Sequence, residues 1–286
     1  MNRREIPAGC RAWPALAPLL GLAAALALVT PAGAQILDGF GAAQTDDPIA
    51  IEAEQGIEWR RDDKTYIARG NARAARGDFA VSADLLTAHY REVDGGGTEI
   101  WQIEAEGDVR LTSAKETVLG DRGSYDLDRG VVVMLGDNLK VETPGETVTA
   151  EDSLEYWDKQ RMVVARGNAV ATRNDDELRA DVLTGYFRSD AAGDPMLFRI
   201  EATGNVRVLS GGDTARGDTA AYDLETEIAT LAGSVKITSG DNQLNGEFAE
   251  VNLKTGVSRI LGGPGAGPVR GLILPGAGTK PESIAP

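Results

Sequence analysis

Residues 202–234 read ATGNVRVLSGGDTARGDTAAYDLETEIATLAGS and contain one complete unit of a repeat. The unit begins at Gly204, continues with the alternating residues Val206 and Val208, and begins again at Gly233. Alternation with a period of two residues is typical of a β-strand. Most of the chain on either side repeats this unit, and such a repeat determines a fold before any single motif does.

The repeat units meet at junctions where a glycine precedes a small or polar residue. Successive junctions are 37, 29, 31, 37, 29 and 29 residues apart, so the first three recur 97 residues later. We infer that one block was duplicated, at about residues 68–164 and 165–261. Gly, Asn and Asp tolerate positive φ, so the junctions are predicted to be corners or bulges. The junctions are Gly70-Asn71, Gly107-Asp108, Gly136-Asp137, Gly167-Asn168, Gly204-Asn205, Gly233-Ser234 and Gly262-Gly263.

The repeats predict a single all-β domain of about six stacked units over residues 49–262. Apolar and polar residues alternate, turn signals recur regularly, and no long segment has the i, i+3, i+4 apolar spacing of a capped helix. The two units of 37 residues contain extra sequence near their ends, at residues 92–102 and 189–198.

An acidic residue precedes a large residue by four or six positions in every unit. Such even spacing places both residues on one face of a strand if no bulge intervenes. We interpret the residues as a structural column, in which an acid at a turn accepts hydrogen bonds from backbone N–H groups. The acids are Asp84, Asp121, Asp152, Asp181, Asp218 and Glu247, and the large residues are Tyr90, Tyr125, Tyr156, Phe187, Tyr222 and Val251.

The two ends of the chain differ from the repeats. Residues 1–34 combine three arginines, an apolar run at residues 15–29 and an Ala-x-Ala sequence ending at Ala34, which is the order of zones in a cleavable secretory signal peptide. An uncleaved anchor is the alternative, although a bilayer span needs about 20 apolar residues. Residues 35–48 are expected to be a linker. Residues 263–286 are rich in Gly and Pro, and we expect a disordered tail.

The composition excludes several classes of protein. The formal net charge is −15, and residues 1–34 carry three Arg and one Glu, so the remainder carries −17. Nucleic-acid phosphates require Lys and Arg, so we expect no nucleic-acid partner. The single cysteine, Cys10, precedes the predicted cleavage site, so the mature chain cannot form disulfides. Its stability must come from backbone ladders and a continuous core.

The residues on which most enzymes and metal sites depend are scarce. The single histidine, His89, has no matching partner in the sequence, and no Cys/His cluster, P-loop or G-x-S-x-G sequence occurs. We therefore expect no catalytic residue, no metal and no cofactor. Two alternatives remain for the acids: calcium binding, as in β-roll repeats, and hydrolysis of a polysaccharide by paired carboxylates.

Apolar residues occupy the second and fourth positions after most junction glycines, and one position later in the third unit. If these positions face inward, they line an apolar interior. In the leading unit of each block the same positions hold only alanine, which either leaves room for a guest or fits a tapered core. The larger residues are Val109, Leu111, Leu139, Val141, Val206, Val208, Val235 and Ile237, and the alanines are Ala72, Ala74, Ala169 and Ala171.

The sequences AEGDVRLTS…LGDRGSYDL and ATGNVRVLS…ARGDTAAYDL resemble the repeat of the OstA-like family, also called the LptA family. The resemblance covers roughly residues 49–261 and depends on the Gly-Asn/Asp-Val start, the acid and the Tyr-Asp-Leu sequence. It implies an open, slightly twisted β-jellyroll of antiparallel strands. It also implies that the eight larger residues form a groove for lipid acyl chains.

The function implied by the resemblance is a periplasmic carrier and bridge that passes lipopolysaccharide from the inner to the outer membrane. The implied partners are lipopolysaccharide, inner-membrane LptC-like and outer-membrane LptD-like jellyroll modules, and further copies of this chain stacked end to end. Burying an acyl methylene is worth about 0.8 kcal/mol, so an apolar trough suffices to hold a lipid. The alternatives are an exported β-repeat scaffold or adhesin without lipid cargo, and a polysaccharide-acting β-helix enzyme.

Overall fold

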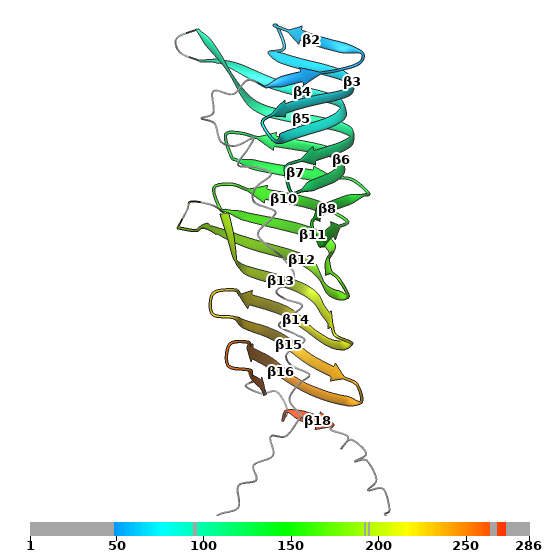
Figure 1. The fold of residues 1–286 in the computed structure, drawn as a ribbon, viewed down its shortest axis with the longest axis vertical. Helices are drawn as coiled ribbons and strands as arrows, with labels where there is room; N and C mark the ends of the chain where they lie inside the picture. Colours follow the sequence, from blue (N-terminus) through cyan, green and yellow to red (C-terminus); the bar gives the residue numbers. More distant parts are fainter. Residues whose placement is uncertain (1–48, 94–95, 192, 194, 264–267, 273–286) are drawn as a thin grey trace, which may run out of the picture.

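The computed structural model describes residues 49–93, 96–191, 193, 195–263 and 268–272. The predicted signal peptide and linker lie outside this part of the chain. The described residues form one antiparallel sheet of 18 strands and contain no helix, which confirms the predicted all-β fold. They accordingly include no helix with the length and hydropathy needed to span a membrane. The strands are stacked along one long axis (Figure 1).

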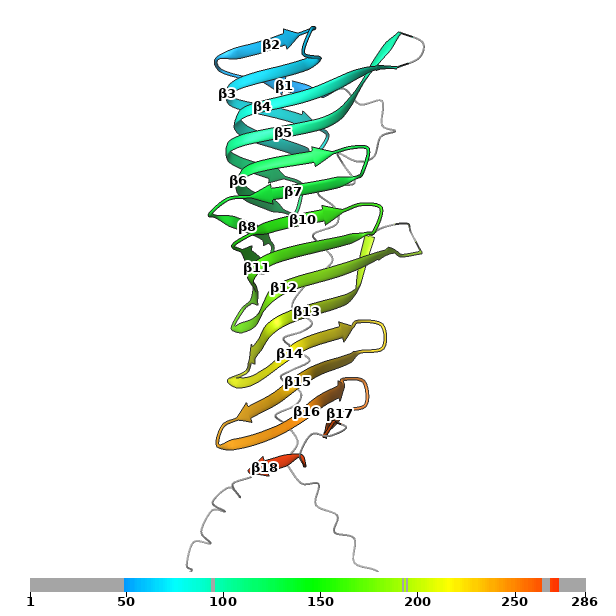
Figure 2. The ribbon, with the colours of Figure 1, turned by 180° about the vertical axis from the view of Figure 1, so that it is seen from behind.

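The strands differ widely in length, from 3 to 16 residues. The short strands lie at the two ends of the stack and in its middle (Figures 1 and 2). The bounds are β1 Ala50–Glu52, β2 Gly56–Arg60, β3 Thr65–Arg76, β4 Phe79–Val93, β5 Gly97–Thr112, β6 Thr117–Asp126, β7 Val131–Leu135, β8 Leu139–Thr143, β9 Glu146–Ala150, β10 Ser153–Trp157, β11 Met162–Arg173, β12 Asp176–Ser189, β13 Pro195–Ser210, β14 Asp213–Asp223, β15 Ile228–Ser239, β16 Asn242–Asn252, β17 Val257–Leu261 and β18 Arg270–Leu272.

The chain runs back and forth, and each pass pairs with the next pass along the sequence. β7 and β8 both pair with β6, and β9 and β10 both pair with β11. Each of these pairs is therefore one long pass that is interrupted in its middle. β1 and β2 share β3 in the same way. A repeat unit corresponds to two neighbouring passes.

Each long pass bends near a junction residue. At Gly204 and Asn205 the φ angles are +79° and +49°, and the register between β13 and β14 shifts between Thr203 and Val206. An extra residue in a left-handed conformation is the signature of a β-bulge, which bends the strand. Consecutive positive φ angles recur at Gly70-Asn71, Gly107-Asp108, Gly167-Asn168 and Gly233-Ser234, so five of the seven predicted junctions are bulged corners. At Gly136-Asp137 only the glycine has a positive φ, and Gly262-Gly263 has none.

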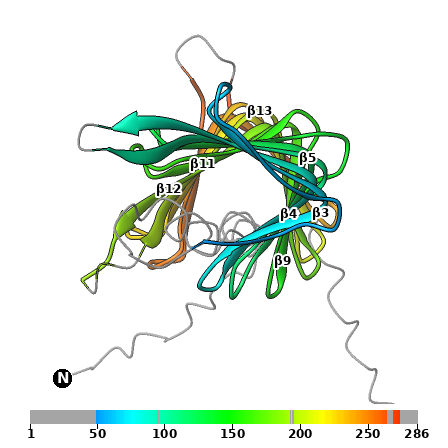
Figure 3. The same cartoon turned by 90° about the horizontal axis from the view of Figure 1, so that it is seen from above.

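The bends divide the sheet into two walls. The first wall consists of the strand halves that precede a junction glycine and the strand halves that pair with them. The second wall consists of the halves that follow a junction glycine and the halves that pair with those. Viewed along the long axis, the strands follow an open curve and do not close into a ring (Figure 3). This confirms the predicted open jellyroll of stacked antiparallel repeats.

The acids and the large residues of the predicted structural column were expected on one strand face only if no bulge lay between them. Bulges do lie between them, so the two sets of residues face different sides. The β12–β13 register shifts between Arg179 and Val182, next to Asp181. Asp181 is exposed as a result, whereas Phe187 on the same strand is 5% exposed. The acid therefore lies at the outer side of the corner and the aromatic ring lies inside.

The extra residues of the two longest units form paired arms. They lengthen the β4–β5 and β12–β13 hairpins, which project on the same side of the stack (Figure 2). A second register shift begins each arm, between His89 and Tyr90 in the first and between Tyr186 and Phe187 in the second. The two shifts lie 97 residues apart in the sequence, which is the length of the inferred block.

The described part of the C-terminal segment differs from the disordered tail that we expected for residues 263–286. Arg270–Leu272 forms β18 and pairs with Gln243, Leu244 and Asn245 of β16. β17 pairs with the other half of β16, so β17 and β18 together form the last edge of the sheet. Backbone pairing with an open edge explains why a segment rich in Gly and Pro has a defined position here.

Candidate functional site

The space between the two walls is lined by apolar side chains from both sides of each corner. Around Gly204, Ile200 and Ala202 come from the first wall, and Val206 and Val208 come from the second wall. All four are 1% exposed. Because strand side chains alternate, the same positions before and after each junction face the interior in every unit. The interior is therefore one continuous apolar cluster along the stack.

All eight predicted groove residues belong to this cluster or pack against it. Leu111 and Val141 are partly buried, whereas the other six are only 1–2% exposed. The six more buried residues are Val109, Leu139, Val206, Val208, Val235 and Ile237. The eight residues thus face inward, but most of them are packed against protein.

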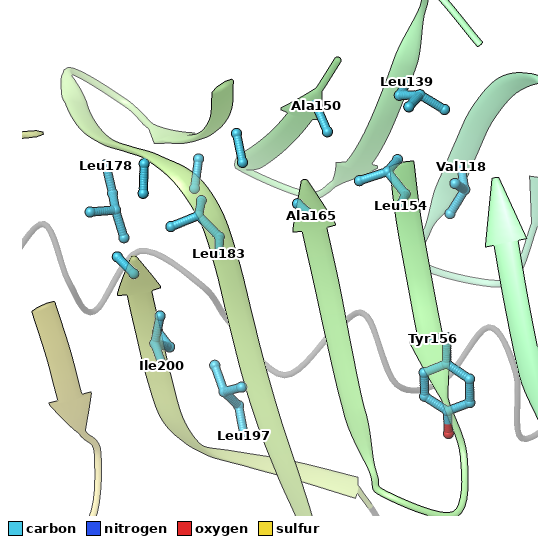
Figure 4. Packing of buried hydrophobic residues seen from close by; sticks show 14 of the residues in the cluster. Val118, Leu139, Ala150, Leu154, Tyr156, Ala165, Leu178, Leu183, Leu197 and Ile200 are labelled. Carbon is cyan, nitrogen blue, oxygen red and sulfur yellow. The ribbon is translucent and has the colours of Figure 1, made fainter. Parts of the chain in front are cut away.

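The largest described cavity lies in the middle of the stack and has a volume of about 120 Å³. Leu111 and Val141 line it from the second wall, as does Val148. Leu154 and Leu183 line it from the first wall, and Figure 4 shows both side chains on the inner side of their strands. Of the eight predicted groove residues, only Leu111 and Val141 line this cavity.

The cavity residues of the first wall were not predicted. The prediction used only the positions after each junction glycine, although apolar residues also occur four and two positions before it. This signal is present in the sequence at Val132 and Met134 before Gly136, and at Val163 and Ala165 before Gly167. The missed lining residues of the first wall are Val132, Met134, Leu154, Tyr156, Val163, Val164, Ala165, Leu183, Phe187 and Ile200, and those of the second wall are Val118 and Val148.

Two smaller cavities continue the interior toward the N-terminal end of the stack. One, of about 40 Å³, is lined by Val109 and Leu111 among others. The other, of about 60 Å³, is lined by Ala74 and Val81 with Ile51 of β1. The described cavities thus lie in the N-terminal and middle parts of the stack.

The alanines of the two leading units have different surroundings. Ala74 lines the 60 Å³ cavity and is partly buried. Its counterpart Ala171, 97 residues later, is 2% exposed and pairs with the buried Leu178. The alanine thus borders a cavity in the first block and is packed in the second.

Polar groups occur at one margin of the largest cavity. Glu146 lines the cavity and forms an ion pair with Arg173, its cross-strand neighbour. The side chains of Glu146 and Arg173 are 8% and 28% exposed, so the pair reaches from the cavity to solvent. The hydroxyl group of Thr143 donates to the backbone oxygen of Glu146. We call Glu146 and Arg173 the rim pair.

The tyrosine rings that line the first wall add no charge at neutral pH. Burial, with a smaller contribution from the carboxylate of Asp158, raises the pKa of Tyr125 to about 12. Burial also raises the pKa of Tyr222. Both phenol groups therefore stay protonated, and Tyr156, which lines the cavity, presents its ring to the apolar space.

The acids of the predicted structural column lie against the junction glycines of the following pass. A Cβ atom on Gly204 would collide with the carboxylate of Asp181, and one on Gly107 would collide with that of Asp84. Asp121 also accepts a hydrogen bond from the backbone N–H of Asp137, at 2.8 Å. Gly136, Gly167 and Gly233 stand in the same relation to Asp121, Asp152 and Asp218.

Within the described residues, no group of three or more His, Cys, Asp or Glu side chains could hold a metal ion. The acids of the column occur one per corner and do not form a carboxylate pair facing a cleft. His89 lies on the first arm, where its Nε2 atom is 3.3 Å from a carboxylate oxygen of Glu104. Its ring packs at 5.7 Å from that of Trp101, in a local surface cluster.

Residues 150–257 match the family described as "LptA/(LptD N-terminal domain) LPS transport protein". This match confirms the resemblance to the OstA-like family. Among solved structures, the chain is similar to "LptH, the LptA homologous periplasmic component of the conserved lipopolysaccharide transport device from Pseudomonas aeruginosa". The identity is 21% over 46% of this chain and 95% of that chain, with a TM-score of 0.38. No curated protein matches the chain.

Proposed function

We propose that this protein carries lipopolysaccharide in the periplasm by holding its acyl chains between the two walls. The observation that carries the proposal is the 120 Å³ cavity, which is lined by apolar side chains from both walls of an unclosed sheet. Each methylene that enters such a space gains about 0.8 kcal/mol. The match of residues 150–257 to a lipopolysaccharide-transport family supports the same class of cargo.

The two ends of the stack support a role as a bridge between membranes. Ile57 and Trp59 of β2 are 54% and 51% exposed, and Leu261 and Leu272 at the other edge are 49% and 62% exposed. Terminal strands with apolar side chains can extend the sheet by pairing with a strand of another module. We propose that LptC-like and LptD-like modules, or further copies of this chain, add at these edges.

A lipid-free scaffold is the second candidate, and one observation favours it. Val206, Val208, Val235 and Ile237 are only 1–2% exposed and line none of the described cavities, so protein side chains fill the C-terminal third of the interior. A scaffold would need no more than this filled core. The cavities in the N-terminal and middle parts favour the carrier instead.

Photo-crosslinking to lipopolysaccharide distinguishes the two candidates. A photoreactive residue at Leu111 or Val141 should form a lipopolysaccharide adduct, because both line the cavity. The matched control is Lys140, which neighbours Val141 and whose side chain is 38% exposed. Folded variants that form no adduct at Leu111 or Val141 would contradict the carrier. An additional adduct at Ile237 would show that the filled third of the interior opens to admit lipid.

A further inference from the structure

The first pass of each block, β3 or β11, ends in an arginine on the face of the strand that is directed to the interior. Alternation from the buried Ala72 and Ala169 places the residues four positions later, Arg76 and Arg173, on the same inner side. We propose that these two arginines hold the phosphate groups of a glycolipid whose acyl chains fill the interior. This inference rests on the proposed function and adds a head-group site to it.

The Nε atom of Arg76 is buried and has no hydrogen-bond acceptor among the described residues. Its cross-strand neighbour is Phe79, and on the other side Ala75 pairs with Ala50, which follows Ile49. The neighbours are thus apolar, and a buried N–H without an acceptor is costly. An anionic oxygen at this position would satisfy it.

Arg173 shows how such an anion is held. The Nε and Nη2 atoms of Arg173 both donate to Oε1 of Glu146, so a carboxylate occupies the position that we assign to a phosphate oxygen. Asp176 is the cross-strand neighbour of Arg173 on the opposite side. The planar guanidinium group binds carboxylate and phosphate with the same fork geometry. Glu146 therefore acts as an internal competitor at the second site.

The two arginines are too far apart to serve one head group. Six strand-to-strand spacings separate β3 from β11, which corresponds to roughly 30 Å at the usual spacing of strands. Each arginine would thus mark a separate lipid position along the stack. The first position is open to an anion, and the second requires displacement of Glu146.

The experiment compares a phosphorylated lipid A with the same lipid after removal of its phosphates, using the full-length mature protein. The wild type should bind the phosphorylated form about tenfold more tightly, as expected for a charge-assisted hydrogen bond in a partly buried site. Arg76→Met should abolish most of this preference and leave the affinity for the dephosphorylated lipid unchanged. The matched control is Arg73→Met, because Arg73 is exposed on the other face of β3.

A second variant tests the competitor at Arg173. Glu146→Gln keeps the size of the side chain and removes its charge, so it should increase the preference for the phosphorylated lipid several-fold. An unchanged preference in this variant would overturn the site at Arg173. Thermal unfolding of each variant checks that the fold is retained.

The remaining outcomes separate this inference from the proposed function. Equal binding of both lipids by the wild type would overturn the phosphate sites and leave the carrier intact. Binding of neither lipid would overturn both. Inorganic phosphate alone should compete only weakly, and tight binding of free phosphate that depends on Arg76 would overturn a site for a lipid head group.

Discussion

The two blocks of the chain share their outer contacts and differ in their interior. The ion pair between Arg91 and Asp128 recurs 97 residues later between Arg188 and Glu225. The contact of His89 with Glu104 recurs as a hydrogen bond from Tyr186 to Glu201. Lys64 and Arg161, which both have positive φ, are also 97 residues apart in the sequence. Their backbone oxygens accept hydrogen bonds from the backbone N–H groups of Tyr90 and Phe187, respectively.

The inner positions do not follow this correspondence. Arg76 has an apolar cross-strand neighbour, whereas Arg173 lies between Glu146 and Asp176. Ala74 borders a cavity, whereas Ala171 is packed. The contacts that hold neighbouring passes together can thus stay constant while the inward residues change. The fold and the properties of its interior depend on different positions.

The largest expected effect concerns the corners, where the two blocks should respond equally. Gly204→Ala and Gly107→Ala should each lower the free energy of unfolding by about 3 kcal/mol, because a Cβ atom meets positive φ and an Asp carboxylate. Urea denaturation measures the effect. Gly211→Ala is the control, because its φ is +58° but no atom lies within 4 Å of the added Cβ, and it should cost about 1 kcal/mol. A large difference between the two blocks would show that their corners are not equivalent.

The next largest effect is a difference in stability cost between equivalent alanine-to-leucine substitutions in the two blocks. Ala171→Leu should destabilise the protein by about 1–3 kcal/mol, because the site is packed. Ala74→Leu should cost less than about 1 kcal/mol, because the side chain can enter the 60 Å³ cavity. The comparison of the two denaturation midpoints is the measurement. Equal costs would mean that the first block has no more internal space than the second.

The smallest effect concerns Glu155 and Glu58, which are related by 97 residues. Burial raises the pKa of Glu155, but hydrogen bonds from Arg166, Trp157 and Ser153 outweigh burial and leave the pKa below 4.5. A lowered pKa stabilises the folded state above the unfolded value and loses this contribution as the pH falls through the folded value. The carboxylate should therefore contribute stability at neutral pH that disappears below about pH 4.5.

Glu155→Gln should cost roughly 1.5 kcal/mol at pH 7 and flatten the loss of stability in acid. Glu58→Gln should have no measurable effect, since the side chain of Glu58 is 52% exposed and that of Glu155 is 11% exposed. Denaturation curves between about pH 3 and pH 7 test both variants. An unchanged acid slope in Glu155→Gln would assign the pH dependence to other carboxylates.

Much of the architecture could be predicted from local features of the sequence. The Gly-Asn pairs predicted the corners because positive φ is a property of single residues. Val206 and Val208 were predicted to face inward because alternation is also local. The acid and the aromatic residue of each unit were harder to place, because a bulge between them changes the face. The positions before each glycine were missed although they alternate in the same way.

The rim pair and Arg76 could not be predicted in this manner. Arg76, Glu146 and Arg173 resemble ordinary charged residues near turns, and their inward direction depends on the register of each pass from its corner. The cross-strand neighbour Glu146 lies 27 residues before Arg173 in the sequence, and the cross-strand neighbour Phe79 lies 3 residues after Arg76. The chemical character of the margin therefore emerges only when the passes are aligned.

The sequence by itself determined that the chain is a stack of bent β-strands with a continuous apolar interior, because period-two alternation and left-handed glycines act within a few residues. The tertiary structure alone decided where the interior is hollow and where it is filled. Ala74 and Ala171 are the same residue type at equivalent positions, yet one borders a cavity and the other is packed. The physical reason is that packing depends on the side chains that neighbouring passes bring opposite each position.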